Sequence, residues 1–174
     1  MAPVDVRNRL QPALLDRLTD EHPGDRVEAE DHRIMSKAQL RQAVLRDLGA
    51  LFNAVQPLGA AAEGHPLLLG SVLNFGLPPL SGQLASKLDV SVVEAAIRQA
   101  IVRFEPRILP DTLRVRALEA TSVLDTHNVI EFEIRGHLWS QPVPLEILLR
   151  TQLDLEAGQV EVHDAASVAP SRAR

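Results

Sequence analysis

The chain has no cysteine and no tyrosine, and aromatic residues make up only 3% of its 174 residues. The absence of cysteine excludes a disulfide framework, a thiolate zinc site and a cysteine nucleophile. With one tryptophan and four phenylalanines, few rings are available to stack on the bases of a single-stranded nucleic acid. We therefore expect one ordinary domain with a core of leucine, isoleucine, valine and alanine.

Positive charge and long apolar runs are also scarce. Lys and Arg number 18 against 23 Asp and Glu, for a formal net charge of -5, so a phosphate backbone is repelled on average and we expect no nucleic-acid partner. No stretch approaches the roughly 20 apolar residues of a membrane span. Charges and prolines interrupt residues 1–18, where a signal peptide needs an apolar region. We expect a cytoplasmic protein without direct membrane insertion.

Common catalytic and ligand-binding patterns are missing as well. The chain contains no G-x-G-x-x-G, no glycine-rich loop ending in Gly-Lys-Ser or Gly-Lys-Thr, and no G-x-S-x-G. Its six histidines are scattered, and no pair has the H-E-x-x-H spacing of a zinc site. We expect no metal, no cofactor and no catalytic residue.

Residues 1–33 predict an N-terminal arm and linker. Leu14, Leu15 and Leu18 suit a short amphipathic helical segment, which is too small to fold alone. The polar stretch that follows is typical of a linker. Two interpretations remain open: the leucines pack on the chain's own domain, or they tether another subunit. We place the folded domain at residues 34–164 and a flexible tail at residues 165–174.

A first amphipathic helix is predicted from Ser36 to about Asn53. Ser36 and Gln39 form a capping box, in which each side chain binds the other residue's amide. Apolar residues then recur at spacings of three and four, which indicates one buried face: Leu40, Val44, Leu48, Leu51 and Val55. Segment 59–82 is rich in glycine and proline yet apolar, so we expect this loop, with Phe75, to pack on the core or on a partner.

A second amphipathic helix is predicted from Ser91 to Phe104. Ser91 and Glu94 match a second capping box, and Glu94 and Arg98 have the spacing of an i,i+4 ion pair. Pro106 ends the helix because the residue before a proline is disfavoured in helical backbone. That residue should therefore be extended.

In the second half of the domain the apolar period changes to alternation, which indicates strands with one solvated face. Strands are expected to begin near Leu113, Val129 and Leu145, and a turn at 156–159 leads into a short strand at 160–163. Helices followed by strands predict an α+β fold. Two main helices should pack on one face of a three- to four-stranded, mainly antiparallel sheet.

An open sheet has edges whose backbone amides and carbonyls lack partners. Segment 145–155 contains no internal proline, and the short strand after it cannot cover its whole length. We expect a partner to add a strand at this edge. Proline at Gln152 or Val162 should then block the addition.

The local group that stands out is Glu105-Pro106-Arg107, in which the proline holds a carboxylate and a guanidinium stiffly. It suits a solvated turn, a structural bridge to another element or subunit, or the general acid of a glycosidase. A glycosidase needs a second carboxylate roughly 5–10 Å away and a raised pKa of the acid. No such partner is evident in the sequence, and Arg107 favours the ionised form of Glu105. We expect the bridge.

Several segments together form a longer pattern. They are Leu14-Leu15-Asp16-Arg17-Leu18-Thr19-Asp20, Leu40-Arg41 through Arg46-Asp47-Leu48, Ser71 through Pro78 with Ser81-Gly82, Ile97 through Arg107, and Gly136-His137-Leu138-Trp139. In order and spacing they resemble the TssE family of type VI secretion baseplate subunits, which belongs with a phage T4 baseplate wedge protein historically labelled a lysozyme. The resemblance runs from Leu14 to about Val162. The chain has Pro79 where the family usually has an acidic residue.

The resemblance implies a cytoplasmic baseplate subunit of a contractile apparatus in a Gram-negative bacterium, assembled at the inner face of the cytoplasmic membrane. It implies TssF, TssG, TssK and sheath subunits as partners, and a part in starting sheath polymerisation. The expected interaction residues are Glu105, Pro106, Arg107, Leu14, Leu15, Leu18 and Phe75. The alternative is a second branch of this fold, an anti-adaptor that binds a response regulator. A peptidoglycan-cleaving lysozyme is disfavoured.

Overall fold

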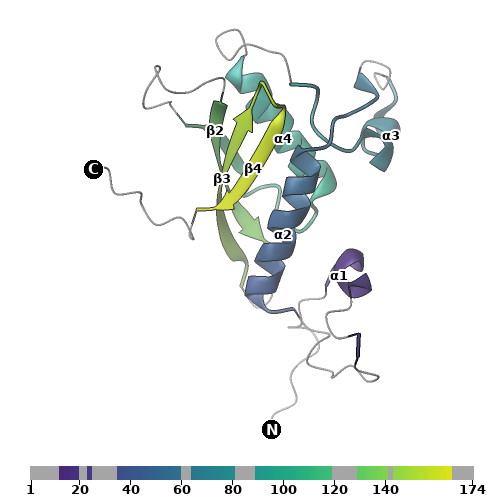
Figure 1. The fold of residues 1–174 in the computed structure, drawn as a ribbon, viewed down its shortest axis with the longest axis vertical. Helices are drawn as coiled ribbons and strands as arrows, with labels where there is room; N and C mark the ends of the chain where they lie inside the picture. The colour runs from purple at the N-terminus through teal and green to yellow at the C-terminus, as the bar shows by residue number, and fades with distance from the viewer. Residues whose placement is uncertain are drawn as a thin grey trace, which may run out of the picture.

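The computed structural model describes residues 12–19, 23–24, 35–59, 64–80, 89–118, 129–140 and 143–165. These residues form a layer of helices on one face of an antiparallel sheet (Figure 1), which confirms the predicted α+β fold. Most of the predicted linker, and the predicted tail after its first residue, lie outside the described residues. The proposed domain limits stay a prediction.

Two long helices provide the helical layer. The helices within the described residues are α1 (Leu14–Leu18), α2 (Lys37–Phe52), α3 (Pro66–Leu69), the short 3-10 helix η4 (Val72–Asn74) and α4 (Val90–Phe104). Segment 59–82, expected as a loop, therefore contains the two short helices α3 and η4.

Helix α2 begins where the capping box predicts. The amide of Gln39 donates to Oγ of Ser36 at 3.2 Å, and the amide of Ser36 donates to Oε1 of Gln39 at 2.9 Å. The apolar positions within the helix are buried. Val55 does not belong to that face: it lies beyond the helix end, and its side chain is exposed.

The predicted cap of α4 is wrong. The N-cap is Asp89, whose Oδ1 accepts from the amide of Ser91 at 3.0 Å and from its hydroxyl at 2.7 Å. Glu94 does not form the expected ion pair with Arg98; its Oε1 accepts from the amide of Ala117 at 2.6 Å. The Ser36–Gln39 and Ser91–Glu94 patterns look alike in sequence, but only the first marks a helix start. Helix α4 starts after Asp89, whose backbone is extended.

The sheet has four strands in sequential order, each antiparallel to the next. They are β1 (Arg114–Ala117), β2 (Val129–Leu138), β3 (Leu145–Asp154) and β4 (Gln159–Asp164). Helix α2 packs along β4 and α4 packs along β1, so the two helices share one face (Figure 1). Alternation along the strands sends Phe132, Ile134 and Leu149 into the core between the layers.

The predicted open edge at 145–155 is wrong for residues 149–154, although the strand that follows is indeed too short to cover the whole segment. Strand β3 pairs with β2 along its whole length and with β4 over residues 149–154. Gln152 therefore lies between Glu131 and Glu161 inside the sheet. A proline at Gln152 would remove a hydrogen-bond donor from the chain's own sheet, so it does not test an open edge. The outer strand on this side is β4, which carries Val162.

Candidate interaction site

The Glu105-Pro106-Arg107 triplet is fixed on both sides. The amide of Glu105 donates to the carbonyl of Ile101 at 2.9 Å and closes the last turn of α4. The backbone of Glu105 then leaves the helix at φ -120° and ψ 76°, as the proline after it requires. On the other side, the amide of Trp139 donates to the carbonyl of Arg107 at 2.7 Å. The turn is thus held between α4 and the end of β2.

Arg107 holds two carboxylates. Its Nε donates to Oε1 of Glu105 at 2.7 Å and its Nη2 donates to Oε2 at 2.5 Å, a two-pronged contact. The same Nη2 donates to Oδ2 of Asp47 on α2 at 2.5 Å. The Glu105 side chain is only 4% exposed. The predicted bridge from the triplet to another element is therefore observed, and its second end is Asp47.

Burial opposes the charged form of Arg107, but bonds and attraction from Glu105, and then from Asp47, outweigh it. The pKa of Arg107 is therefore raised above its ordinary value, and the guanidinium stays charged. Within the described part of the chain, its Nη1 is buried and has no hydrogen-bond partner. Such an atom gains from a partner that brings an acceptor.

The charge network continues to the N-terminal arm. Nε of Arg46 donates to Oδ1 of Asp47 at 2.9 Å, and Nη1 of Arg46 donates to Oδ1 of Asp16 on α1 at 2.6 Å. The pKa of Arg46 is raised, chiefly by its bond to Asp16. Acidic and basic residues thus alternate from Asp16 through Arg46, Asp47 and Arg107 to Glu105. The network links α1, α2 and the triplet.

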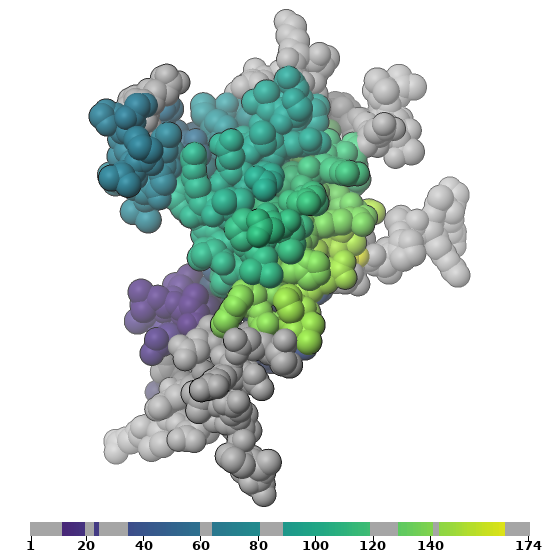
Figure 2. Space-filling model, turned by 180° about the vertical axis from the view of Figure 1, so that it is seen from behind, coloured from purple at the N-terminus to yellow at the C-terminus, as the bar shows by residue number. Residues whose placement is uncertain are grey.

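An open hollow of about 500 Å³ lies beside this network. Its lining combines the triplet with residues from the arm, α2 and the loop after η4: Ala13, Asp47, Ala50, Leu51, Phe75, Phe104, Glu105, Pro106 and Arg107. Phe75 and Phe104 meet edge to face, with ring centroids 5.2 Å apart at 67°. In the space-filling view, α1 and the α3–η4 segment project from the same side of the molecule, separated by a recess (Figure 2).

The predicted arm residues do not pack into the domain. Leu14, Leu15 and Leu18 are 72%, 56% and 73% exposed, and no residue of α1 is buried. On the other side of the hollow, Val72 and Leu73 of η4 are also exposed. The hollow therefore combines charged and apolar side chains in its lining, and exposed apolar side chains lie on α1 and η4 nearby. Its full set of side chains comes from four separate parts of the chain.

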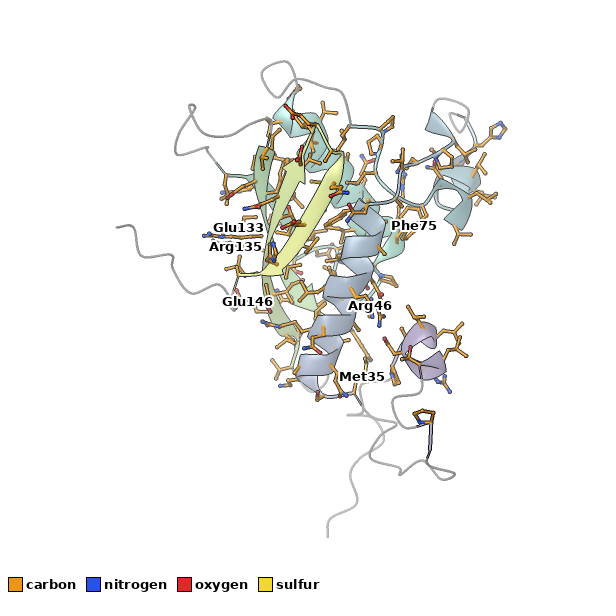
Figure 3. The ribbon with its side chains drawn as sticks, in the orientation of Figure 1. Met35, Arg46, Phe75, Glu133, Arg135 and Glu146 are labelled. Carbon is orange, nitrogen blue, oxygen red and sulfur yellow. The ribbon has the colours of Figure 1, made fainter. Side chains whose placement is uncertain are left out.

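Figure 3 shows how the sides of the molecule differ. Arg46 and Phe75 lie on the side of α2 that carries α1 and η4, whereas Glu133, Arg135 and Glu146 project from the sheet face away from α2. On that sheet face Nε of Arg135 donates to Oε1 of Glu133 at 2.7 Å in a solvent-exposed pair. The hollow joins apolar and charged groups, whereas this part of the sheet face is charged and solvated.

The sequence named Glu105, Pro106, Arg107 and Phe75 among the expected interaction residues, and the structure brings these four together in the lining of the hollow. Leu14, Leu15 and Leu18, named with them, are not part of that lining. The sequence prediction missed Asp47 as the second partner of Arg107 and Arg46 as the link to the arm. The available signal was that Arg46 and Asp47 lie off the apolar stripe of α2, but an off-stripe charge is usually only solvated.

No carboxylate partner of Glu105 is evident in the sequence, but the structure supplies one. The carboxylates of Asp47 and Glu105 accept hydrogen bonds from the same nitrogen, Nη2 of Arg107. The arrangement still differs from a glycosidase pair. Both oxygens of Glu105 accept hydrogen bonds from Arg107, so neither is positioned to present a proton to a sugar oxygen.

The described ranges contain no group of three or more His, Asp or Glu side chains placed to hold a metal ion. Among the helices of the described residues, none has the length and apolar character to cross a membrane.

Comparison with known proteins agrees with this architecture. The family model described as baseplate wedge protein gp25 matches residues 38–143, which include α2 from its second residue onward, the hollow's triplet and β2. The chain belongs to this family, which is one of structural baseplate proteins and includes TssE. Searches of curated proteins and of solved structures returned no match.

Proposed function

We propose that the chain is the wedge subunit of a type VI secretion contractile apparatus and that the hollow beside Glu105-Pro106-Arg107 receives another wedge subunit. The observation that carries this proposal is the hollow's lining, which combines the Arg107 charge network with aromatic and other apolar side chains, next to the exposed leucines of α1. Arginine and aromatic residues in a hollow, surrounded by apolar side chains, are the composition of interface hot spots. Family membership supports a baseplate role as such.

The arm acts as a tether in this proposal. Helix α1 is seated by the Asp16–Arg46 pair, while Leu14, Leu15 and Leu18 face outward. Burial of an exposed leucine side chain contributes about 1.5–3 kcal/mol. Burial of three leucines by a partner therefore contributes more binding free energy than is lost if the Asp16–Arg46 ion pair breaks. The proposed partners on this side are TssF, TssG and TssK.

The sheath is the proposed partner of the opposite edge of the fold. Strand β4 is the outer strand of the sheet next to α2, and an extended segment of the first sheath subunit is expected to pair with it. We place the protein in the cytoplasm, assembled through the baseplate at the inner face of the cytoplasmic membrane. We assign it no catalytic activity.

The test is co-purification of the tagged full chain from cells that express the secretion apparatus. The wild type should retain TssF, TssG and TssK. A variant with Leu14, Leu15 and Leu18 changed to Ser should lose them while unfolding at the same temperature, because none of these side chains is buried. Arg107→Lys keeps the charge but cannot form the two-pronged contact with Glu105. This variant should also fail to retain TssF, TssG and TssK.

The matched control is Leu67→Ser on α3, an equally apolar and exposed change away from the lining of the hollow. It should retain the partners. Recovery of a response regulator in place of wedge subunits would assign the anti-adaptor function instead.

A further inference from the structure

Asn53, at the C-terminal end of α2, covers one residue of the outer sheet edge. Its Nδ2 donates to the carbonyl of Val160 at 2.8 Å, and its Oδ1 accepts from the amide of Val160 at 2.9 Å. A carboxamide carries a donor and an acceptor in one plane, as a peptide group does. Asn53 therefore occupies the place that a residue of a neighbouring strand takes in a ladder.

The side chain is also held to its own helix. Nδ2 of Asn53 donates to the carbonyl of Gly49 at 2.8 Å, and the backbone amide of Asn53 donates to the same carbonyl at 3.2 Å. These contacts orient the carboxamide toward β4. At the other end of β4, Arg41 of α2 forms an ion pair with Asp164 at 2.9 Å. Helix α2 is thus tied to both ends of this strand.

The next outward-facing position lacks such a cover. In an antiparallel strand the backbone groups of alternate residues face the same neighbour, so Val162 presents its amide and carbonyl on the same side as Val160. The amide of Ala165 donates to the carbonyl of Leu148 at 2.9 Å, which places the odd-numbered residues of this strand toward β3. Among the described side chains, none holds the backbone of Val162 as Asn53 holds Val160.

We propose that Asn53 is a gate on the β4 edge. The occupant is an extended segment of the sheath subunit, so the inference rests on the sheath contact proposed above. With Asn53 in place, this segment pairs with β4 at Val162, and pairing that extends to Val160 requires displacement of the carboxamide. The gate also limits pairing between copies of this chain before assembly, a hazard of uncovered strand edges.

The gate predicts an unusual direction for a substitution. Asn53→Ala removes two hydrogen bonds that an incoming strand otherwise has to replace, so it should strengthen sheath binding. Two net hydrogen bonds correspond to a gain of roughly 5- to 150-fold in affinity. A residue that contacts the partner directly, or that only supports the fold, gives weaker binding when truncated.

The control is Gln56→Ala. Gln56 also follows α2, and its Nε2 donates to the carbonyl of Gly76 at 2.9 Å, away from β4. It therefore tests for loss of a side-chain bond near the same helix end without a change at the strand edge. Sheath affinity should be unchanged in this variant.

The experiment measures amide hydrogen exchange of the full chain, alone and with the purified sheath subunit, together with the affinity. In the free wild type, Val160 should exchange more slowly than Val162, and Asn53→Ala should accelerate exchange at Val160. On sheath binding, Val162 should gain protection in both proteins, and Val160 should gain it only in Asn53→Ala.

Equal exchange at Val160 in the two free proteins, or sheath affinity that is unchanged or lower in Asn53→Ala, overturns the gate. A second outcome is that no residue of β4 gains protection when sheath is added, in either protein. This outcome overturns the strand-addition part of the proposed function and, with it, the gate. Slow exchange of Val160 in the free wild type, lost in Asn53→Ala, would then show only that Asn53 covers the edge.

Discussion

Arg107 and Asp47 lie 60 positions apart in the chain, and their side chains meet with 2.5 Å between Nη2 and Oδ2. The contact joins the turn after α4 to the middle of α2. Because the same nitrogen also binds Glu105, one guanidinium fixes the relative position of both long helices at the hollow.

Arg107→Ala should destabilise the domain by about 3–5 kcal/mol, because it leaves the buried carboxylate of Glu105 unpaired. Asp47→Ala should have a smaller effect, about 1 kcal/mol, since Arg107 keeps Glu105 and Asp47 is partly exposed. Urea unfolding measures both. Arg135→Ala, which breaks a pair on the solvated sheet face, is the control and should show no measurable loss. Equal stability of Arg107→Ala and the wild type would contradict the assignment.

Gly76→Ala should be one of the most damaging single changes in the loop. Gly76 has φ +121°, and a Cβ atom there lies 2.3 Å from the backbone oxygen of Ala54. The expected loss is at least about 2–4 kcal/mol, with displacement of Phe75 from the hollow. Gly49→Ala is the matched control: it has open space within α2 and should stabilise by about 0.5–1 kcal/mol. Thermal unfolding distinguishes the two, and a neutral Gly76→Ala would rule out the close approach.

Asp16→Ala should release the arm without destabilising the domain. The Asp16–Arg46 contact is an ion pair whose arginine is 44% exposed, so its loss should change the free energy of unfolding by less than about 1 kcal/mol. Limited proteolysis should cut between α1 and α2 faster in this variant, and also in wild type at high salt. Arg17→Ala, an exposed neighbour, is the control. Identical cleavage rates in all three proteins would show that Asp16 does not seat the arm.

The N-cap of α4 should make stability depend on pH. The hydroxyl and then the amide of Ser91 bind the carboxylate of Asp89 and lower its pKa below the ordinary 3.8. The folded state therefore favours the charged form. Its stabilising contribution is complete above the ordinary value and disappears as the pH falls through the lowered one.

Asp89→Ala tests this directly. It should lower the unfolding temperature at neutral pH, and the difference from wild type should close as the pH falls below 3.8. The measurement is a series of thermal unfolding curves in buffers of decreasing pH. A difference that persists unchanged into acid would show that the cap acts through something other than the charged carboxylate.

The purified chain should not hydrolyse peptidoglycan. Glu105 is engaged by Arg107 through both oxygens, and Asp47 shares the same guanidinium. Turbidity loss of a peptidoglycan suspension is the assay, with an active muramidase as positive control. Hydrolysis that Glu105→Gln abolishes would establish a catalytic function for this carboxylate.

Local features were predictable because their causes lie within a few residues. The capping box at Ser36 and the stop at Pro106 each act on one turn of backbone, and both were predicted correctly. The start of α4 was not, because Ser91 and Glu94 match the capping-box pattern, whereas the helix is capped two residues earlier by Asp89, which forms a simple N-cap with Ser91. A pattern of side chains alone does not decide at which residue the backbone leaves the helix.

The sequence by itself determined the α+β class, the positions of the long helices and strands, and a structural bridge at Glu105-Pro106-Arg107. These follow from apolar periodicity and from backbone restrictions that operate over short distances. Only the tertiary structure decided that Asp47 completes the bridge, that β3 is interior, and that Asn53 covers the edge at Val160. Each of these depends on which distant side chains the packed layers bring within hydrogen-bond distance, and no local pattern carries that information.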